Sequence, residues 1–404
     1  MIEIRNVQIP NDTRRDVFIP STRPQTIEAS RYTLLPALID PHVHFRTPGH
    51  EHKETWETGV LAAIAGGVTH VLDMPNNYPS CCSLERVLQK KQLIESQLQM
   101  ADIPLRYGLY LGADRNCFDE IAVSKNEVVA LKIYMGSSTG DLLLHDRPSL
   151  EKAFQLAAEH QILVAVHAED EGLIQINRNQ YSAVENPQMH SVIRNPNVAA
   201  KAVEMAIECA QKFNARLYLV HISSAAELSL IRQAKRDRLS VYAEASPHHL
   251  FLSDLAYGHL HTKALVNPPL RARTDVEALW ESLQDGTIDT IGTDHAPHTK
   301  AEKMQPFGLA PSGFASIELY LALLLNAHHQ NKISLKSIIA LTHTNVRRIF
   351  NLPSNDDCVL VDLEKTKTVT DCSLKTKAKW SPYAGWTLTG WPCFTILKGR
   401  VYAV

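Results

Sequence analysis

The sequence has no long apolar run and no excess of either charge. Its segment Ile317–Leu325 is about the longest apolar stretch, well short of the ~20 residues that a membrane-spanning helix needs. The 41 basic and 43 acidic residues give a net charge of −2, so no overall field attracts nucleic acid or an anionic membrane. The first residues, Met1–Arg5, do not form the basic-then-apolar pattern of a signal peptide. We therefore expect a small-molecule substrate, with no nucleic-acid and no membrane partner.

Cysteine is scarce and scattered along the chain. The seven cysteines include the adjacent pair Cys81 and Cys82, but no two have the Cys-x-x-Cys spacing. A chain of 404 residues can bury a large core without covalent cross-links, so a disulfide framework is not expected. Reduced thiols are the simpler interpretation, and they favour a cytoplasmic protein.

Short apolar, β-rich segments alternate with amphipathic helical patterns such as Glu54–Ala65 and Val198–Phe213. This alternation is typical of parallel strands joined by right-handed helical crossovers, and eight such units close into a (β/α)8 TIM barrel of the α/β class. The alternative is an open doubly wound sheet, but no Gly-x-Gly-x-x-Gly motif follows the first strand. The predicted strands are Leu34–Asp40, Val68–Met74, Arg106–Gly112, Val129–Met135, Ile162–Ala168, Arg216–Ile222, Ser240–Ser246 and Ile288–Asp294.

Both ends of the chain are rich in short β patterns, for example Ile2–Ile4 and Val359–Leu363. We expect residues 1–33 and 352–404 to pair with each other as a small β domain, while residues 34–351 form the catalytic barrel. The last barrel helices are predicted at Phe314–His328 and Leu335–Phe350.

Residue types that commonly bind metals lie at the carboxyl ends of several predicted strands. The first strand leads into Asp40-Pro41-His42-Val43-His44, and side chains two apart on a strand share a face. Each such residue alone has an ordinary role, as a core histidine or a helix cap, but parallel barrel strands bring all of them to one mouth. Imidazole and carboxylate suit zinc and similar cations. The candidate ligands are His42, His44, His167, His221 and Asp294.

A lysine, Lys132, lies within the otherwise apolar fourth strand. A charged ammonium beside metal ligands would repel the cations and lose its hydration, so burial favours the neutral amine. A neutral amine can add carbon dioxide to form an anionic carbamate with two ligand oxygens. We therefore expect a carbamate on Lys132 that bridges two divalent metal ions. Zinc is the expected element, but the residues alone do not decide between zinc, manganese and cobalt, or whether one or two ions stay bound.

With these strand ends in place, the chain resembles the dihydroorotase family of the amidohydrolase superfamily. The motifs that carry the resemblance follow the family's order and cover nearly the whole chain. They are the run Asp40–Gly49, then Asp73–Asn77, Val266–Arg271 and Thr293–His298.

The resemblance implies a reaction and a role for each metal ligand. One ion would be bound by His42, His44, Lys132 and Asp294, and the second by Lys132, His167 and His221. Asp294 would also be the general base for a hydroxide that bridges the ions. The implied enzyme is a hydrolase of cyclic amide C–N bonds that interconverts N-carbamoyl-L-aspartate and (S)-dihydroorotate plus water, in pyrimidine biosynthesis.

Substrate selection would depend on a carboxylate clamp. Arg46 follows His44 by two residues and so can face the same mouth, where its guanidinium would bind a carboxylate with two parallel hydrogen bonds. The resemblance adds further substrate contacts, which are His44, Asn76, Asn267, His298 and the backbone at Ser312 and Gly313.

Several alternatives remain open from the residues alone. The related enzymes allantoinase and dihydropyrimidinase are one alternative. Allantoinase shares the metal set, but its ring substrate carries no carboxylate for Arg46 to bind. A non-catalytic barrel relative would have lost some of the six ligands. The small, polar segment Ser137–Asp141 suits either a closing lid or an ordinary loop. A homodimer is common in the family, and the residues do not decide the oligomeric state or an association with other enzymes of the pathway.

Overall fold

The computed structural model describes residues 1–10, 12–138, 140–181 and 185–404. At its centre eight parallel strands pair in chain order, and a bridge between Val43 and His295 links the first strand to the segment after the last. The predicted (β/α)8 barrel is confirmed. The strands are β5 (Leu38–Val43), β6 (Val68–Asp73), β7 (Arg106–Gly112), β8 (Ala130–Tyr134), β9 (Val164–His167), β10 (Leu217–Leu219), β11 (Val241–Ala245) and β12 (Thr290–Ile291).

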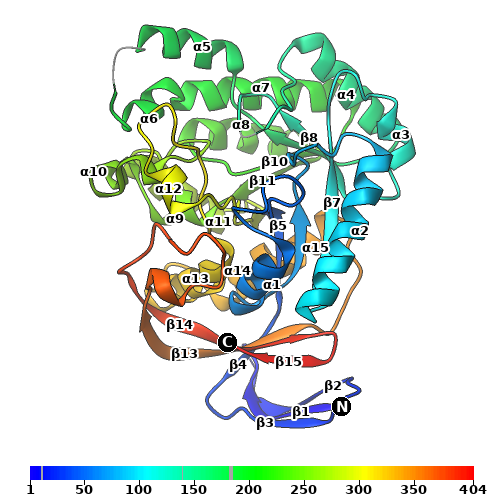
Figure 1. Ribbon diagram of the computed structural model, residues 1–404, viewed down its shortest axis with the longest axis vertical. Coiled ribbons are helices and arrows are strands. Elements are labelled where there is room, and N and C mark those ends of the chain that lie inside the picture. Colours follow the sequence, from blue (N-terminus) through cyan, green and yellow to red (C-terminus); the bar gives the residue numbers. More distant parts are fainter. Residues whose placement is uncertain (11, 139, 182–184) are drawn as a thin grey trace.

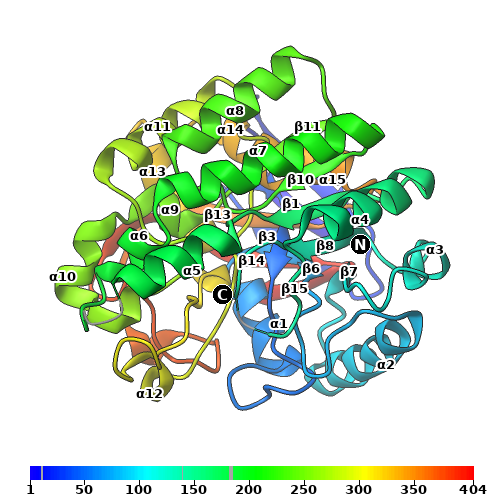
Figure 2. The ribbon, with the colours of Figure 1, turned by 90° about the horizontal axis from the view of Figure 1, so that it is seen from above.

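Helices cover the outside of these strands, as Figure 2 shows from above. Side-chain caps define several starts: Thr55 caps the first barrel helix in a capping box, and Ser83 accepts a hydrogen bond from Arg86 N at the start of the second. No helix in the described part of the chain is both long and apolar enough to cross a membrane. The main barrel helices are α1 (Trp56–Ala65), α2 (Leu84–Ala101), α3 (Glu120–Ser124), α4 (Arg147–Glu159), α5 (Glu171–Gln180), α7 (Pro196–Phe213), α8 (Ala225–Arg236) and α11 (Arg273–Gln284).

Shorter helices lie in the loops between these elements and after the last strand. The loop helices are α6 (Met189–Ile193), α9 (Pro247–Phe251), α10 (Tyr257–Leu260), α12 (Lys300–Lys303) and the 3-10 turns η1 (Asp254–Ala256) and η2 (His261–Ala264). After β12 and α12 follow the 3-10 turn η3 (Ile317–Leu319), α13 (Tyr320–His329), α14 (Leu335–Ile339), the π-helical turn η4 (Ala340–Thr344) and α15 (Asn345–Ile349).

A second sheet combines strands from both termini, as predicted, and lies below the barrel in Figure 1. Its strand order is β15-β14-β13-β4-β1-β2, with β3 also paired to β1. The N-terminal and C-terminal halves meet where Leu35 pairs with Val359. The strands are β1 (Ile2–Gln8), β2 (Arg14–Ile19), β3 (Gln25–Glu28), β4 (Thr33–Pro36), β13 (Cys358–Thr368), β14 (Thr387–Leu397) and β15 (Arg400–Ala403), with the turn η5 (Asp371–Ser373) between β13 and β14.

The single strand predicted over Leu34–Asp40 is wrong, because β4 and β5 are separate strands in different sheets. The chain changes hydrogen-bond partner within two residues: Ala37 N donates to Asp357 O, and Leu38 N donates to Gly67 O. The apolar run through this point contains no polar residue that would reveal the change.

The two last predicted helices also differ from the structure. The helix predicted to begin at Phe314 begins at Tyr320, after the turn η3, because Phe314 still extends the barrel edge and its carbonyl accepts from Ala296 N. The helix predicted over Leu335–Phe350 is interrupted by η4, where the Thr342 hydroxyl donates to Ile338 O.

Candidate active site

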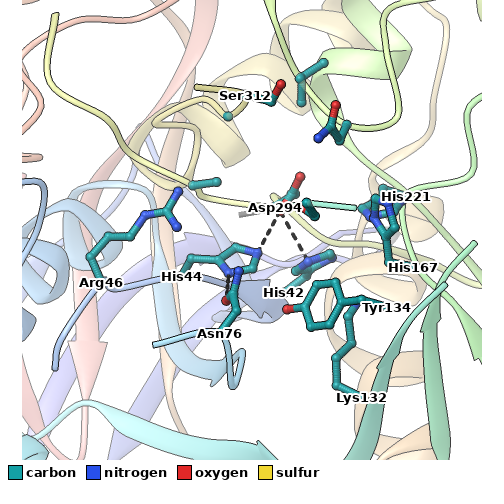
Figure 3. Close-up of a pocket in the computed structure, with 15 residues that line it drawn as sticks. His42, His44, Arg46, Asn76, Lys132, Tyr134, His167, His221, Asp294 and Ser312 are labelled. Carbon is teal, nitrogen blue, oxygen red and sulfur yellow. Dashed lines mark hydrogen bonds and ion pairs between the residues drawn. The ribbon is translucent and has the colours of Figure 1, made fainter. Parts of the chain in front are cut away.

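All the predicted site residues except His298 line one cavity of about 370 Å³ at the carboxyl ends of the barrel strands. The C-terminal face of such a barrel is where its active sites form. Figure 3 shows Asp294 at the centre, with Arg46 on one side and His167 and His221 on the other. The lining includes all six predicted metal ligands and, among the predicted substrate contacts, His44, Arg46, Asn76, Asn267, Ser312 and Gly313.

Backbone geometry at the strand ends turns three of these side chains into the cavity. Arg46, His221 and Asp294 have φ angles of 61°, 40° and 45°, in the left-handed region that side chains other than glycine seldom occupy. Such conformations carry a cost of about 1–3 kcal/mol each and persist where the surrounding structure holds them, typically at functional sites.

His42, His44 and Asp294 form a compact group of ligand atoms. Asp294 Oδ1 lies 3.2 Å from His42 Nε2 and 3.0 Å from His44 Nε2. The other ring nitrogens are engaged: His42 Nδ1 lies 2.8 Å from Glu244 Oε1, and His44 Nδ1 lies 2.7 Å from Asn76 Oδ1. Because the carboxylate and the amide oxygen only accept, each Nδ1 carries the hydrogen and each Nε2 offers its lone pair to the group.

His167 and His221 form a second pair on the far side of the cavity. His167 Nδ1 and His221 Nε2 lie 2.9 Å apart and face each other, and the His221 ring is 5.3 Å from that of His42. Burial lowers the pKa of both imidazoles, so both are neutral rather than cationic.

Lys132 projects from β8 into the same space. Its side chain is fully buried, and its Nζ has no hydrogen-bond partner among the described residues. Burial lowers the pKa of Lys132 to about 7, although the carboxylates of Glu244 and Asp294 oppose the shift. A large fraction of this amine is therefore neutral near pH 7.

These donors fit a divalent metal centre. Neutral imidazoles with free lone pairs, a carboxylate and an unpartnered amine that can become a carbamate are the groups that bind zinc-like cations. The three ligand atoms of His42, His44 and Asp294 all lie within 4.8 Å of one another. Without a cation, so many inward-facing lone pairs at one point would have no attractive partner.

A second polar group lies around Arg46, on the opposite side of Asp294. Arg46 is 3% exposed, and its Nε donates to Pro297 O. Its Nη2 lies 3.0 Å from His298 Nε2. His298 does not line the cavity itself, but it contacts Arg46, Ser312 O at 3.1 Å and, through Nδ1, the ammonium of Lys53 at 3.0 Å.

The backbone contact predicted at Ser312 and Gly313 also lies on the cavity wall. Gly313 has a φ of +142°, and a Cβ there would lie 2.5 Å from Ala296 O. Glycine is therefore required at this point, where the loop approaches the strand end closely.

Three residues with clear roles around the cavity were missed by the sequence interpretation. Glu244, on β11, is fully buried; its carboxylate accepts hydrogen bonds from Tyr218 and from His221 N besides the contact to His42. A charged residue inside an apolar strand was the available signal, as for Lys132. Lys53 lies in a loop and His190 in the short helix α6, and no local pattern distinguishes them from surface residues.

The segment Ser137–Asp141 is only partly placed, since Thr139 lies outside the described residues. Ser137 N donates to Glu171 Oε2, Ser137 O accepts from Arg194, and Asp141 accepts from the Ser80 hydroxyl. Ser138 lines the cavity, so the segment contributes to its wall. Whether it closes as a lid stays a prediction.

The chain belongs to the amidohydrolase family, whose sequence pattern matches residues 33–355. Relatives that match over most of the chain are named dihydroorotases. It is 34% identical to a dihydroorotase of Halobacterium salinarum over 377 residues, which cover 91% of this chain and 86% of the relative. It is 31% identical to a dihydroorotase of Methanosphaera stadtmanae over 99% of this chain and 93% of that one. The resemblance predicted from the motifs is confirmed.

Solved structures support the same architecture. An L-hydantoinase (dihydropyrimidinase) from Arthrobacter aurescens superimposes with a TM-score of 0.92 over 100% of this chain and 96% of its own, at 23% identity. A dihydropyrimidinase from Brevibacillus agri gives a TM-score of 0.88 at 27% identity, over 99% and 94% of the two chains. The first likeness establishes the shared fold and nothing about the substrate.

Proposed function

We propose that this chain is a dihydroorotase, which interconverts N-carbamoyl-L-aspartate and (S)-dihydroorotate plus water. The observation that carries this choice of substrate is a pair of hydrogen-bond donors, Arg46 and His298, beside the candidate metal ligands. Relatives with the same name, similar over nearly the whole chain, support it.

The contacts of His298 determine which of its nitrogens carries the hydrogen. The Lys53 ammonium donates to Nδ1, so Nδ1 is an acceptor and Nε2 bears the hydrogen, which suits the carbonyl of Ser312. Arg46 Nη2 also only donates, yet it lies 3.0 Å from this Nε2. Two donors that face each other at this distance repel unless an acceptor binds both, and a substrate carboxylate is such an acceptor.

Two divalent ions, which we propose to be zinc, would be bound by His42, His44, His167, His221, Asp294 and a carbamate on Lys132. When bound, such ions lower the pKa of water and polarise an amide carbonyl. The carbamate forms when the neutral Lys132 amine adds carbon dioxide and releases one proton. The buried, unpartnered Nζ and its lowered pKa support this step.

Asp294 is positioned to move the proton during ring opening. Its carboxylate would accept a proton from the attacking water and deliver it to the ring nitrogen that leaves, and the two steps reverse in ring closure. The clamp would meanwhile hold the ring by its carboxylate, so that the amide carbonyl lies between Arg46 and the metal ligands.

The test is an assay of purified enzyme with dihydroorotate, dihydrouracil, hydantoin and allantoin, together with metal analysis. We expect turnover of dihydroorotate, at least about 10²-fold faster than of the rings without a carboxylate. We also expect two zinc ions per chain. Faster turnover of hydantoin or dihydrouracil would favour the dihydropyrimidinase alternative, and a metal-free, inactive protein would favour a non-catalytic relative.

We further propose that the enzyme acts in the cytoplasm, which the seven unbridged cysteines support. A homodimer is the assembly to test, by light scattering of the purified chain.

A further inference from the structure

Asn267 lies on the wall between two cavities. It lines the catalytic cavity and also a larger outer cavity of about 1620 Å³ that opens to solvent. Its side chain forms one hydrogen bond within the described part of the chain, to His190, which lines the outer cavity only. An asparagine here presents either its oxygen or its nitrogen to substrate. The oxygen would accept a hydrogen bond from a substrate donor, whereas the nitrogen would donate one to a substrate acceptor.

The contacts of His190 decide between them. Its Nε2 lies 3.0 Å from the backbone carbonyl oxygen of Val266 and 2.9 Å from Asn267 Oδ1. A backbone carbonyl can only accept, so Nε2 carries the hydrogen. With the amide reversed, the Asn267 NH₂ group would meet this N–H, donor against donor. His190 therefore binds the oxygen of Asn267 and leaves its nitrogen to the catalytic cavity.

Neighbouring contacts hold His190 in place independently of Asn267. Its helix, α6, is also attached to the loop that carries Asn267, because the Ser191 hydroxyl donates to Leu270 O at 2.8 Å. The imidazole packs edge-on against Phe307, with ring centroids 6.4 Å apart. The position of His190 therefore does not depend on its hydrogen bond to Asn267. That bond can instead determine the orientation of the Asn267 amide.

We propose that His190 is a positioning residue that commits the Asn267 amide to donate hydrogen bonds to substrate. Asn267 then selects for an oxygen acceptor, a ring carbonyl or a carboxylate, and against a ring N–H at that position. This inference rests on the proposed function, because it assigns part of the recognition of dihydroorotate to a residue that lies outside the catalytic cavity.

The test is a double-mutant cycle in zinc-loaded enzyme, with KM and kcat measured for dihydroorotate. We expect H190A and N267A each to raise KM about tenfold while kcat changes less. We expect the double variant to match N267A alone, because His190 acts through Asn267. H190Q, whose side-chain amide still offers an N–H, should recover most of the loss.

S191A is the matched control, since it removes a bond between α6 and the same loop without touching Asn267, and its KM should stay near that of the wild type. The inference is overturned if H190A has wild-type kinetics or if S191A raises KM as much as H190A. It is also overturned if the KM increase of the double variant equals the product of the increases in H190A and N267A. A wild-type enzyme inactive on dihydroorotate would instead overturn the proposed function.

Discussion

The two sides of the catalytic cavity are built differently. On the metal-ligand side, His42, Lys132 and His167 belong to barrel strands, and strand pairing fixes their positions. On the carboxylate side, Arg46 and His298 belong to loops, outside any strand. Figure 3 shows Arg46 and the histidines His167 and His221 on opposite sides of Asp294.

The support for the two sides also differs. On the metal-ligand side, buried carboxyl groups hydrogen-bond to the imidazoles from behind. The main one is Glu244, which accepts from His42 and from Tyr218. The carboxylate side is backed by donors, such as Lys53 behind His298. Acceptors behind imidazoles leave lone pairs facing a cation, whereas donors behind imidazoles leave N–H groups facing an anion. Under the proposed function, the same type of side chain would thus bind opposite charges according to its partner.

Replacing Lys132 should have the largest effect and should break the metal side alone. In K132M we expect both metals to be lost and activity to fall by at least about 10³-fold, because the shared ligand is gone. The measurements are metal content and dihydroorotate turnover. Because a buried, unpartnered amine destabilises a fold, the metal-free variant should unfold at or above the temperature of metal-free wild type.

Added zinc should raise the unfolding temperature of the wild type and leave that of K132M unchanged. Full metal content and activity in K132M would contradict the assignment of Lys132 as a ligand.

Replacing Arg46 should break the carboxylate side and leave the metals in place. We expect R46M to lose about 10²- to 10³-fold in kcat/KM, since a substrate carboxylate would be buried without its charged partner. R46K should recover only a small part, because an ammonium cannot form two parallel hydrogen bonds. Metal content is the control, and a matching loss of zinc would show that the two sides are not separate.

The sequence was a better guide to the candidate metal ligands than to the residues that hydrogen-bond to the site residues from behind. His42 lies near the end of the first barrel strand with His44 two residues on, and Lys132 interrupts an apolar run, so local pattern and barrel topology together predicted where they meet. The barrel itself followed from the same alternation of strands and helices. Lys53 and His190 carry no such pattern, because each is singled out by a contact with a residue far away in the sequence. Lys53 contacts His298, which is 245 positions away, and His190 contacts Asn267, which is 77 positions away.

Replacing Glu244 should weaken the metal side without removing a ligand. Burial raises the pKa of Glu244 to about 8. E244Q keeps the size and most hydrogen bonds of the side chain but removes the titratable carboxyl group behind His42. We expect metal affinity to fall about 10- to 100-fold, as is usual for partners of metal-binding imidazoles. Competition with a chelator measures this affinity, and at saturating zinc the KM for dihydroorotate should return to the wild-type value. A lasting rise in KM would place Glu244 in substrate binding instead.

Replacing Lys53 should have the smallest effect, on the carboxylate side only. In K53M, His298 loses the donor to Nδ1, but the carbonyl of Ser312 still favours hydrogen on Nε2. We therefore expect KM to rise only about three- to tenfold, with kcat and zinc affinity unchanged. K300M is the matched control, because Lys300 is exposed, pairs with Asp371 at 3.3 Å and contacts neither His298 nor Arg46. Loss of zinc in K53M, or an equal rise in KM in K300M, would contradict the prediction. Either result would mean that the Lys53 donor does not make His298 and Arg46 prefer an anion.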